Sequence, residues 1–313
     1  AGGVQMLSQW YFSSRLKRPF KFNLKEEKPA IKRLVKIITP AIFGQAIIEI
    51  NLIADNLFAV MLSSGVISAM YYSTRLMQLP MGIFAVSIAT VSLTIFSRKV
   101  SKGESPQKEL QTSFNSLMYV ILPVSSYLMA AGIYPVKALF QRGEFDLASS
   151  TITASLLTFY AAGIIFYSLS KLFGQVFYAY KQVKYPVIFT SVAMLINIEL
   201  NMIFIRYMGA SGLALASALS AAVNVVFLWI YLKKMFGLTL NISKMIKLIP
   251  AFAVSYFLLK YFGGHLNAFF TPIMPAFFAN TLISIVLLMI NMLPYMLFVG
   301  PSKFIRIFRK RGI

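Results

Sequence analysis

One arginine stands inside a stretch that is otherwise suited to the interior of a membrane. Arg75 lies near the start of the segment 71–98, and no charged residue follows it for about twenty residues. An arginine at such a position costs roughly 3 to more than 10 kcal/mol unless it faces a wet cavity or a partner. Pro80 removes a backbone hydrogen bond from the same helix and favours a kink there. These features predict an anion site within the membrane, with a snorkelling arginine at a helix end as the alternative.

Four further polar side chains have oxygen atoms of the kind that a hard cation binds. They come from three separate apolar segments: Asp55, Asn197 with Asn201, and Ser217. Asn197 and Asn201 are four residues apart, so they share one helix face. Carboxylate, carboxamide and hydroxyl oxygens from separate helices can together form a cation site. The other interpretation is hydrogen bonding between helices, worth about 0.6–2 kcal/mol for each contact.

Two more charged residues fall within the apolar segments. Glu49 lies in the same segment as Asp55, where Asn51 also precedes Asp55 by four residues. Two acids in one span are expected to face the interior of the bundle. Lys171 lies about two turns from the predicted cytoplasmic end of its helix, so it either snorkels or contacts a substrate. Glu49 and Lys171 are therefore candidates for lining a central cavity.

The residues needed for several other kinds of chemistry are missing from the sequence. There is no cysteine, which excludes disulfides and thiolate metal sites. The one histidine, His265, is expected at the surface, in a short loop that contains glycine and asparagine. No nucleophile–base pair and no phosphate-binding loop are present, so the sequence does not predict an enzyme.

The composition indicates an all-α integral membrane protein. The chain has 313 residues, of which 58% are hydrophobic and 12% charged, and its mean hydropathy is +0.73. Soluble domains carry about 25% charged residues. Apolar segments of helical length favour a polytopic helical bundle over a barrel. Eight spans are predicted, at about 37–61, 67–96, 111–136, 150–180, 186–205, 212–232, 248–262 and 273–299.

The positive charge gathers on one side of the predicted membrane. Of the 30 lysines and arginines, 24 fall in alternate connections, and the formal net charge of the chain is +21. By the positive-inside rule the first full span starts in the cytoplasm and the C-terminus ends there. We expect contacts with phospholipid headgroups and no nucleic-acid partner. The basic stretches are 13–36, 97–110, 181–185, 233–247 and 300–313.

The two ends of the chain differ from its middle. Residues 1–12 are apolar and are expected to be the end of a preceding transmembrane helix, so the chain is interpreted as the later part of a longer protein. Residues 13–36 are interpreted as a cytoplasmic basic amphipathic linker or, alternatively, as a disordered basic loop. Residues 233–313 hold two spans without an acid, which are expected to face lipid or to form a greasy groove, and a basic cytoplasmic tail.

Four stretches, in this order, resemble the MurJ (MviN) family of lipid II flippases: INLIADNLFA, YYSTRLMQLPMGIFAVSIATVSLTIFSR, LFQRGEFD and FYAYKQVKYP. The second is the most specific, matching a pattern of the type YYxxRLxxxPxGxxxxxxxTxxxxxxSR. The family belongs to the multidrug/oligosaccharidyl-lipid/polysaccharide exporter superfamily. The resemblance covers the whole chain and implies the end of a sixth helix, a second six-helix lobe at 37–232, and two C-terminal helices that form a groove for a polyprenyl tail.

The resemblance implies transport of lipid II, an undecaprenyl-pyrophosphate-linked peptidoglycan precursor, from the inner to the outer leaflet of the bacterial inner membrane by alternating access. Arg75 matches the family's cavity arginine, expected to bind the pyrophosphate by charge-assisted hydrogen bonds. The resemblance implies no cofactor other than a bound sodium ion. The full-length protein is expected to be a monomer, and this chain alone should not transport because the N-terminal lobe is missing. The family's sodium site maps to Asp55, Asn197, Asn201, the carbonyl of Leu213, and Ser217.

The chain departs from the family pattern at a few positions. Thr74 stands where many members have an acid, so an ion-pair partner of Arg75 must lie elsewhere. Asn201 stands where a carboxylate can serve the sodium site, which lowers the formal charge of that site. Gln182 and Tyr185 replace the common Asp and Thr near the exit of the tenth helix.

Other functions compete with the flippase interpretation. A drug/cation antiporter of the same superfamily is disfavoured by a cavity-facing arginine. A non-transporting membrane scaffold for cell-wall synthesis would tolerate changes at Arg75 and Asp55, and an intramembrane transferase lacks a base. For the flippase, inward movement of a cation is expected to reset the cycle, since one charge is worth about 2.3 kcal/mol per 100 mV.

Overall fold

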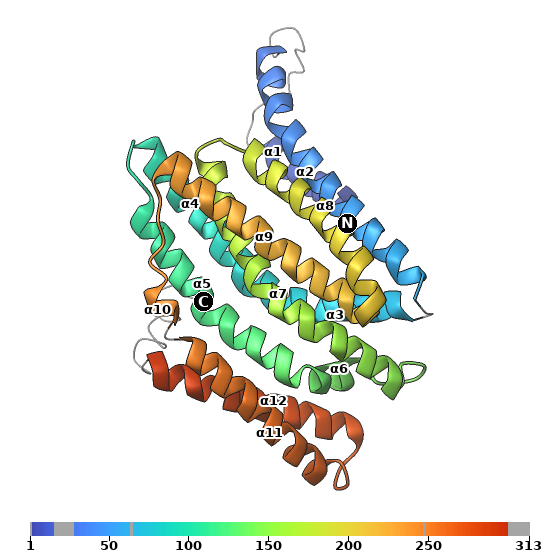
Figure 1. Cartoon of the computed structure of the whole chain (residues 1–313). Coiled ribbons are helices and arrows are strands. Elements are labelled where there is room, and N and C mark those ends of the chain that lie inside the picture. Colours follow the sequence, from blue (N-terminus) through green and yellow to red (C-terminus); the bar gives the residue numbers. More distant parts are fainter. Residues whose placement is uncertain (1, 16–27, 63–64, 247, 300–313) are drawn as a thin grey trace. The chain divides into compact units, whose positions relative to one another are not determined.

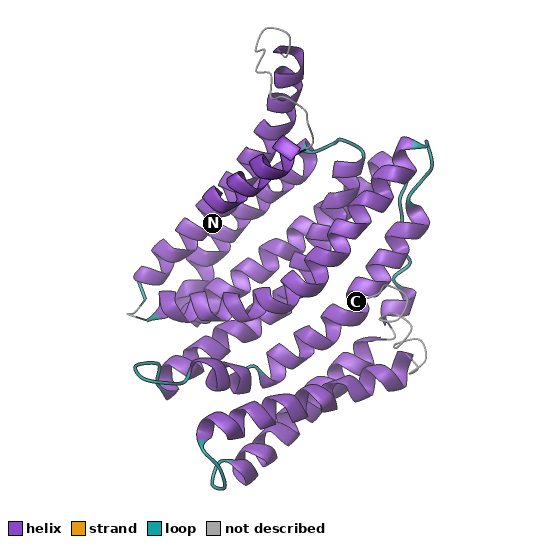
Figure 2. Cartoon of the chain, turned by 180° about the vertical axis from the view of Figure 1, so that it is seen from behind, coloured by secondary structure: helices purple, strands orange, loops and turns teal. Residues whose placement is uncertain are grey.

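The computed structural model describes residues 2–15, 28–62, 65–246 and 248–299, and these residues form helices and their connections without any strand (Figure 2). The all-α prediction is confirmed for this part of the chain. The chain divides into two compact units, residues 1–42 and 43–313. Most of the predicted linker 13–36 and the basic tail 300–313 lie outside the described residues.

The helices follow one another with short connections (Figure 1). Seven helical stretches among the described residues are long and apolar enough to cross a membrane. In chain order the elements are α1 (Gly2–Arg15), α2 (Lys28–Val60), α3 (Val66–Pro80), the π-helix η1 (Met81–Val86), α4 (Ser87–Ser101), α5 (Gln107–Ala131), α6 (Ile133–Phe140), α7 (Leu147–Ala179), α8 (Lys184–Met208), α9 (Ala210–Phe236), α10 (Ser243–Ile246), α11 (Leu248–Phe270) and α12 (Ala276–Val299).

The predicted span 248–262 differs from the structure in its length and in the place of its histidine. It forms the 23-residue helix α11, which is not among the seven apolar stretches because Lys260 and His265 lower its hydropathy. The prediction of a loop at His265 is wrong, since the helix continues to Phe270. Helix α11 packs closely against Tyr134 at Gly263, where an added Cβ would lie 3.0 Å from the Tyr134 hydroxyl.

The Arg75 segment is one helical stretch with an irregular centre. Residues Val66–Ser101 form one helical stretch of 36 residues that is long and apolar enough to cross a membrane. Pro80 has no N–H to donate to the preceding turn, and the next six residues, Met81–Val86, form the π-helix η1. Single π turns inside α-helices are often found at functional sites. The π-helix begins six residues after Arg75, within two helical turns.

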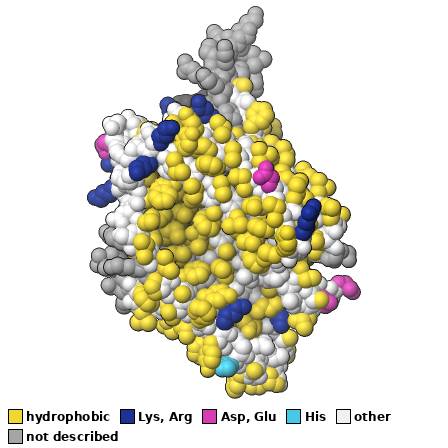
Figure 3. Space-filling model, in the orientation of Figure 1, with side chains coloured by type: hydrophobic (Ala, Val, Ile, Leu, Met, Phe, Trp, Pro, Cys, Tyr) yellow, Lys and Arg dark blue, Asp and Glu magenta, His cyan; other side chains and the backbone are white. Residues whose placement is uncertain are grey.

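Helix α7 is the centre of the unit 43–313. It packs against α3, α4, α5 and α9, and its side chains Leu156, Ile164 and Phe177 are fully buried. Small residues bring α7 and α9 together, since an added Cβ at Gly163 would lie 3.0 Å from the Cβ of Ala218. Small residues of this kind let two membrane helices pack closely. Hydrophobic side chains cover most of the face seen in Figure 3, as expected for a protein surrounded by lipid.

A buried polar cluster joins the C-terminal hairpin of α11 and α12 to α5. We call it the Asn291 cluster: Asn291, Ser126, Ser255, Tyr295 and the carbonyl of Pro123, whose named side chains are fully buried. Asn291 Oδ1 accepts from Ser126 Oγ at 2.9 Å and from Ser255 Oγ, while Asn291 Nδ2 donates to Pro123 O at 2.8 Å. Tyr295 OH donates to Ser126 Oγ at 3.1 Å. The two amide atoms of Asn291 are therefore both hydrogen-bonded.

Two glutamines of α5 hold the extended connection between α9 and α10, which runs beside α5 in Figure 1. Gln107 Oε1 accepts from Thr239 N at 2.9 Å, and its amide nitrogen donates to Thr239 O. Gln111 Oε1 accepts from Asn241 N at 2.7 Å, and Gln111 Nε2 donates to Asn241 O at 3.1 Å. These contacts fix the connection that precedes the C-terminal helices α11 and α12 to α5.

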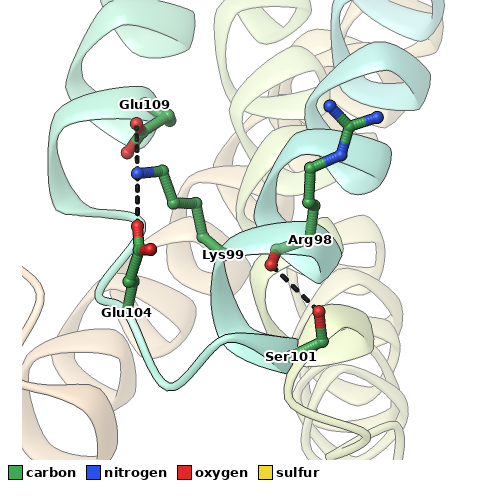
Figure 4. Close-up of polar contacts among 5 residues, drawn as sticks. All are labelled: Arg98, Lys99, Ser101, Glu104 and Glu109. Atoms are coloured by element: carbon green, nitrogen blue, oxygen red, sulfur yellow. Dashed lines mark hydrogen bonds and ion pairs between the residues drawn. The ribbon is translucent and has the colours of Figure 1, made fainter.

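The connection between α4 and α5 is closed by an ion pair (Figure 4). Lys99 Nζ lies 2.5 Å from Glu104 and 3.7 Å from Glu109. Ser101 Oγ donates to Arg98 O at 2.9 Å, while the exposed Arg98 side chain makes no ion pair with a described acid. Exposed ion pairs of this kind are worth about 0–1 kcal/mol. The basic stretch 97–110 thus leaves cations available for lipid headgroups.

Candidate functional site

A cavity of about 750 Å³ lies within the unit 43–313 and is lined from five helices, α2, α3, α7, α8 and α9. Arg75 lines it from α3, Lys171 from α7 and Asp55 from α2. The predicted anion-binding residue Arg75 and two of the predicted cation-binding residues, Asp55 and Ser217, therefore line one cavity. Polar groups of both charges in such a space can bind a charged ligand away from the lipid.

The packing of α3 aims Arg75 at the cavity. On the face packed against α7, Ser73 Oγ donates to Thr153 O at 2.8 Å, and Leu76 is buried. Arg75 then lies on the face of α3 that the cavity exposes, one turn from Tyr71. A helix with one face held against its neighbour in this way cannot turn its arginine to lipid.

The Arg75 guanidinium has an aromatic neighbour and, among the described residues, no acidic partner. Its central carbon lies 4.8 Å from the centroid of the Tyr71 ring, a cation–π contact. The Thr74 hydroxyl donates to the backbone carbonyls of Met70 and Tyr71, both at 2.9 Å, and so does not bind Arg75. No described acid forms an ion pair with Arg75. Most of its donors are thus available to an anion.

Lys171 is a second cation on the cavity wall. It is exposed on α7, where Gln175 and Tyr178, one and two turns later, also line the cavity. Neither described ion pair involves Lys171. At 1.5 Å per residue it lies about 12 Å before the end of α7 at Ala179. The structure places Lys171 where a ligand in the cavity can reach it.

The residues predicted for the cation site come together from α2, α8 and α9. Asn201 Nδ2 donates to Asp55 Oδ1 at 2.7 Å and to Asn197 Oδ1 at 3.2 Å. Asn197 Nδ2 donates to Ser217 Oγ at 3.3 Å, and Ser217 Oγ donates to Leu213 O at 3.0 Å. Each of these five residues is buried. We call this set, Asp55, Asn197, Asn201, Leu213 and Ser217, the Asp55 cluster.

The hydrogen bonds of the Asp55 cluster are incomplete. Asn201 Oδ1 is buried and accepts no hydrogen bond, although the Asn201 side chain is fully enclosed. A buried polar atom without a partner costs about 1–3 kcal/mol. A cation bound in the cluster could supply the partner that Asn201 Oδ1 lacks.

Glu49 has a different position from the one expected. It is exposed, accepts a hydrogen bond from Gln45 Nε2 at 2.9 Å, and is not among the residues that line the cavity. Asn51, between Glu49 and Asp55, does line the cavity. Its spacing of four residues from Asp55, which places both on one helix face, is the sequence signal for this position.

Comparison with known proteins identifies the same family over most of the chain. The family model described as lipid II flippase MurJ matches residues 1–288. A probable lipid II flippase MurJ of Vibrio cholerae is 33% identical over 245 residues, which cover 76% of this chain and 46% of that protein. A probable lipid II flippase MurJ of Thermotoga maritima is 32% identical over 219 residues, covering 70% of this chain and 46% of that protein. The chain thus spans about half the length of these relatives.

Solved structures share the fold. A lipid II flippase MurJ in an inward closed conformation superposes with a TM-score of 0.72 at 23% identity, covering 96% of this chain and 59% of that one. A multidrug resistance transporter of the MATE family in an outward-facing conformation, from the MOP superfamily, gives a TM-score of 0.55 at 13% identity, with 88% of this chain and 66% of that one covered. At these identities the likeness concerns the helical arrangement alone.

Proposed function

Because this chain belongs to the lipid II flippase MurJ family, we propose that it supplies the second lobe and the C-terminal hairpin of a lipid II flippase. The whole protein would move lipid II from the inner to the outer leaflet of the bacterial inner membrane. It would act as a transporter and not as an enzyme. The observation that carries this proposal is Arg75, which lines a cavity among helices of membrane-spanning length and forms no ion pair with an acid in the described part of the chain.

Arg75 and Lys171 would bind the anionic part of the substrate. A guanidinium presents a planar fork of donors that matches pyrophosphate oxygens, and such charge-assisted bonds are about twice as strong as neutral ones. Lys171 is nearer the proposed cytoplasmic end of the cavity and would meet the headgroup first. Transfer from Lys171 towards Arg75 would then follow the direction of transport.

The hairpin of α11 and α12 would lie along the polyprenyl tail. Its apolar side chains Phe257, Met289 and Leu297 are 70%, 67% and 81% exposed. A surface of this kind suits an acyl or polyprenyl chain, because neither partner has polar groups to desolvate. The tail would stay in lipid while the headgroup crosses inside the protein.

The Asp55 cluster would hold the coupling cation, proposed to be sodium. Its carboxylate, two amides, hydroxyl and backbone carbonyl are oxygen ligands suited to a hard cation. The buried Asn201 oxygen without a partner supports a role in ligation. Sodium entering along its gradient and the membrane potential would drive the return between inward- and outward-facing states.

The orientation follows from the charge asymmetry. Basic connections such as 97–110 would face the cytoplasm, as would the C-terminus. Phospholipid headgroups would contact these cations. The N-terminal lobe would complete the cavity from the other side, and the full-length protein would function as a monomer.

A drug/cation antiporter is the second candidate within the same superfamily, and the MATE-like fold is compatible with it. An unpaired cavity arginine repels cationic drugs, which favours the flippase. A scaffold for cell-wall synthesis would not need charged residues in the cavity and would tolerate changes at Arg75 and Asp55. Substitution of the cavity residues therefore separates the three functions.

The test is growth of a flippase-depleted bacterium that expresses the full-length protein containing this chain. The wild type should restore growth, and Arg75→Ala should fail at an equal membrane level. Arg206→Ala is the matched control, since Arg206 is exposed and does not line the cavity. Full growth with Arg75→Ala would refute the anion role, and failure of the wild type would refute the substrate.

A further inference from the structure

Asn51 of α2, which lines the cavity, lies beside the buried side-chain amide of Asn197 of α8. Asn51 lies one turn before Asp55 on α2. When the Asn197 amide is turned so that its nitrogen faces α2, this nitrogen lies 3.0 Å from Asn51 Oδ1 and 3.0 Å from Asp55 Oδ1. Its oxygen then accepts from Ser217 N at 3.1 Å. In this orientation the amide hydrogen atoms separate the neighbouring oxygens.

In the opposite orientation the Asn197 oxygen takes that place. It then lies 3.0 Å from both Asn51 Oδ1 and Asp55 Oδ1, and accepts one hydrogen bond from Asn201. Three oxygens at this separation repel one another unless a positive charge lies between them. With the nitrogen at this point, Asn197 donates to both oxygens but lies 3.2 Å from the donor nitrogen of Asn201, whereas with the oxygen there a cation would be needed between the three oxygens.

The spacing of these oxygens suits a cation of moderate size. Oxygen ligands of calcium, which is similar in size to sodium, lie about 2.3–2.6 Å from the ion. Two such ligands 3.0 Å apart subtend an angle of roughly 75° at the ion, which is normal for six or seven ligands. The second, independent sign is Asn201 Oδ1, which is buried in the same cluster without a partner.

We propose that Asn51 is a further ligand of the cation held by the Asp55 cluster, and that this site selects monovalent over divalent ions. The proposal rests on the cation role in the proposed function. Asn51 adds an oxygen without adding charge, so Asp55 remains the one carboxylate of the set. No group of three His, Cys, Asp or Glu side chains converges among the described residues. One carboxylate balances one sodium ion, whereas calcium sites use more charged ligands.

The alternative is that Asn51 only accepts a hydrogen bond from Asn197. In that case the two residues form an uncharged link between α2 and α8, and loss of Asn51 would lower stability equally with and without sodium. The two roles therefore differ in their dependence on the ion.

The experiment measures thermal unfolding of the 313-residue chain in lipid nanodiscs while sodium replaces choline at constant ionic strength. For the wild type, the melting temperature should rise with sodium and saturate. Asn51→Leu should raise the sodium concentration at half saturation at least tenfold. Asn56→Leu is the matched control, because Asn56 lies on α2 and lines the same cavity outside the Asp55 cluster, and it should stay within twofold of the wild type.

Asn51→Asp tests the charge of the site and also serves if Asn51→Leu fails to fold. A second carboxylate should allow calcium to raise the melting temperature, which calcium should not do in the wild type. A residue that only accepts a hydrogen bond would give no calcium response.

The outcomes separate the two proposals. Wild-type sodium binding in Asn51→Leu, or no calcium response in Asn51→Asp, would overturn the role of Asn51 and leave the Asp55 cluster as a cation site. No sodium response in the wild type would overturn both cation proposals. The anion role of Arg75 would still be judged by growth of the depleted bacterium.

Discussion

The Asn291 cluster and the Asp55 cluster are both buried groups of amides and hydroxyls, but they differ in how completely they are bonded. Asn291 Oδ1 accepts two hydrogen bonds and its nitrogen donates one, so the amide has a partner at each end. In the Asp55 cluster, Asn201 Oδ1 accepts none. In the Asn291 cluster protein atoms bond both atoms of the Asn291 amide, whereas in the Asp55 cluster the Asn201 oxygen is left for a ligand.

Their surroundings differ in the same sense. The Asn291 cluster has no charged member and joins α5, α11 and α12. The Asp55 cluster contains a carboxylate, and Asp55 and Ser217 line the cavity. Polar residues within a membrane thus serve two purposes, and the number of bonds at each atom distinguishes them. A complete set holds helices together, while an incomplete set next to a cavity indicates a ligand.

The largest effect on stability is expected from Asn291→Leu. It removes the amide that accepts from Ser126 and Ser255 and donates to Pro123 O, and only the weaker set remains: Ser126 Oγ to Pro123 O at 2.9 Å and Ser255 Oγ to the backbone carbonyl of residue 291 at 3.4 Å. The free energy of unfolding should therefore fall by about 2–4 kcal/mol. Sodium dependence should not change. Detergent-induced unfolding with and without sodium measures both quantities. A shift in the half-saturating sodium concentration would mean that the two clusters are coupled and would break the distinction.

An intermediate effect is expected from Asp55→Asn. The amide oxygen can still accept from Asn201, so stability in choline should stay near that of the wild type. Stabilisation by sodium should disappear, a loss of about 2.7 kcal/mol at a sodium concentration of 100 times the dissociation constant. Isothermal titration of sodium into the purified chain checks the loss of binding. Retained binding would show that the carboxylate is not a ligand.

The smallest effects are expected from two matched serines, Ser217 and Ser255, which are both buried. Ser217→Ala removes one neutral ligand and should raise the half-saturating sodium concentration about fivefold, or roughly 1 kcal/mol. Ser255→Ala should lower the free energy of unfolding by about 1 kcal/mol without changing the sodium response. Melting curves over a sodium series give both numbers. Equal behaviour of the two variants would remove the contrast between the clusters.

The fold class was predicted correctly, and four members of the Asp55 cluster, Asp55, Asn197, Asn201 and Ser217, could be singled out as polar residues in apolar segments, because each of these features has a local signal. Long apolar segments show the helices, and the spacing of Asn197 and Asn201 shows a shared face. Their meeting with Asp55 is not a local property, since Asp55 and Asn201 are 146 residues apart. It could be expected only through the family resemblance.

The Asn291 cluster was missed for the same reason. Asn291 is a single polar residue in an apolar helix, and its partner Ser126 is 165 residues away. Serine is common in membrane helices, so neither residue stands out. His265 was predicted in a loop because the two glycines before it suggest a turn. In the structure, Gly263 instead lets helix α11 pack closely against Tyr134. Contacts between distant helices decide such cases, and a single sequence contains no direct record of them.

Gln107 and Gln111 hydrogen-bond the α9–α10 connection through its backbone. The connection should therefore tolerate substitution, whereas the two glutamines should not. The glutamines bind the backbone of Thr239 and Asn241, as a neighbouring strand would, and not their side chains. In a saturation library, position 239 should therefore accept nearly any amino acid except proline, which has no N–H to donate. Position 107 should accept few, because only an amide side chain offers a donor and an acceptor side by side. Variation in this region would thus be common in the segment that is held and rare in the residues that hold it.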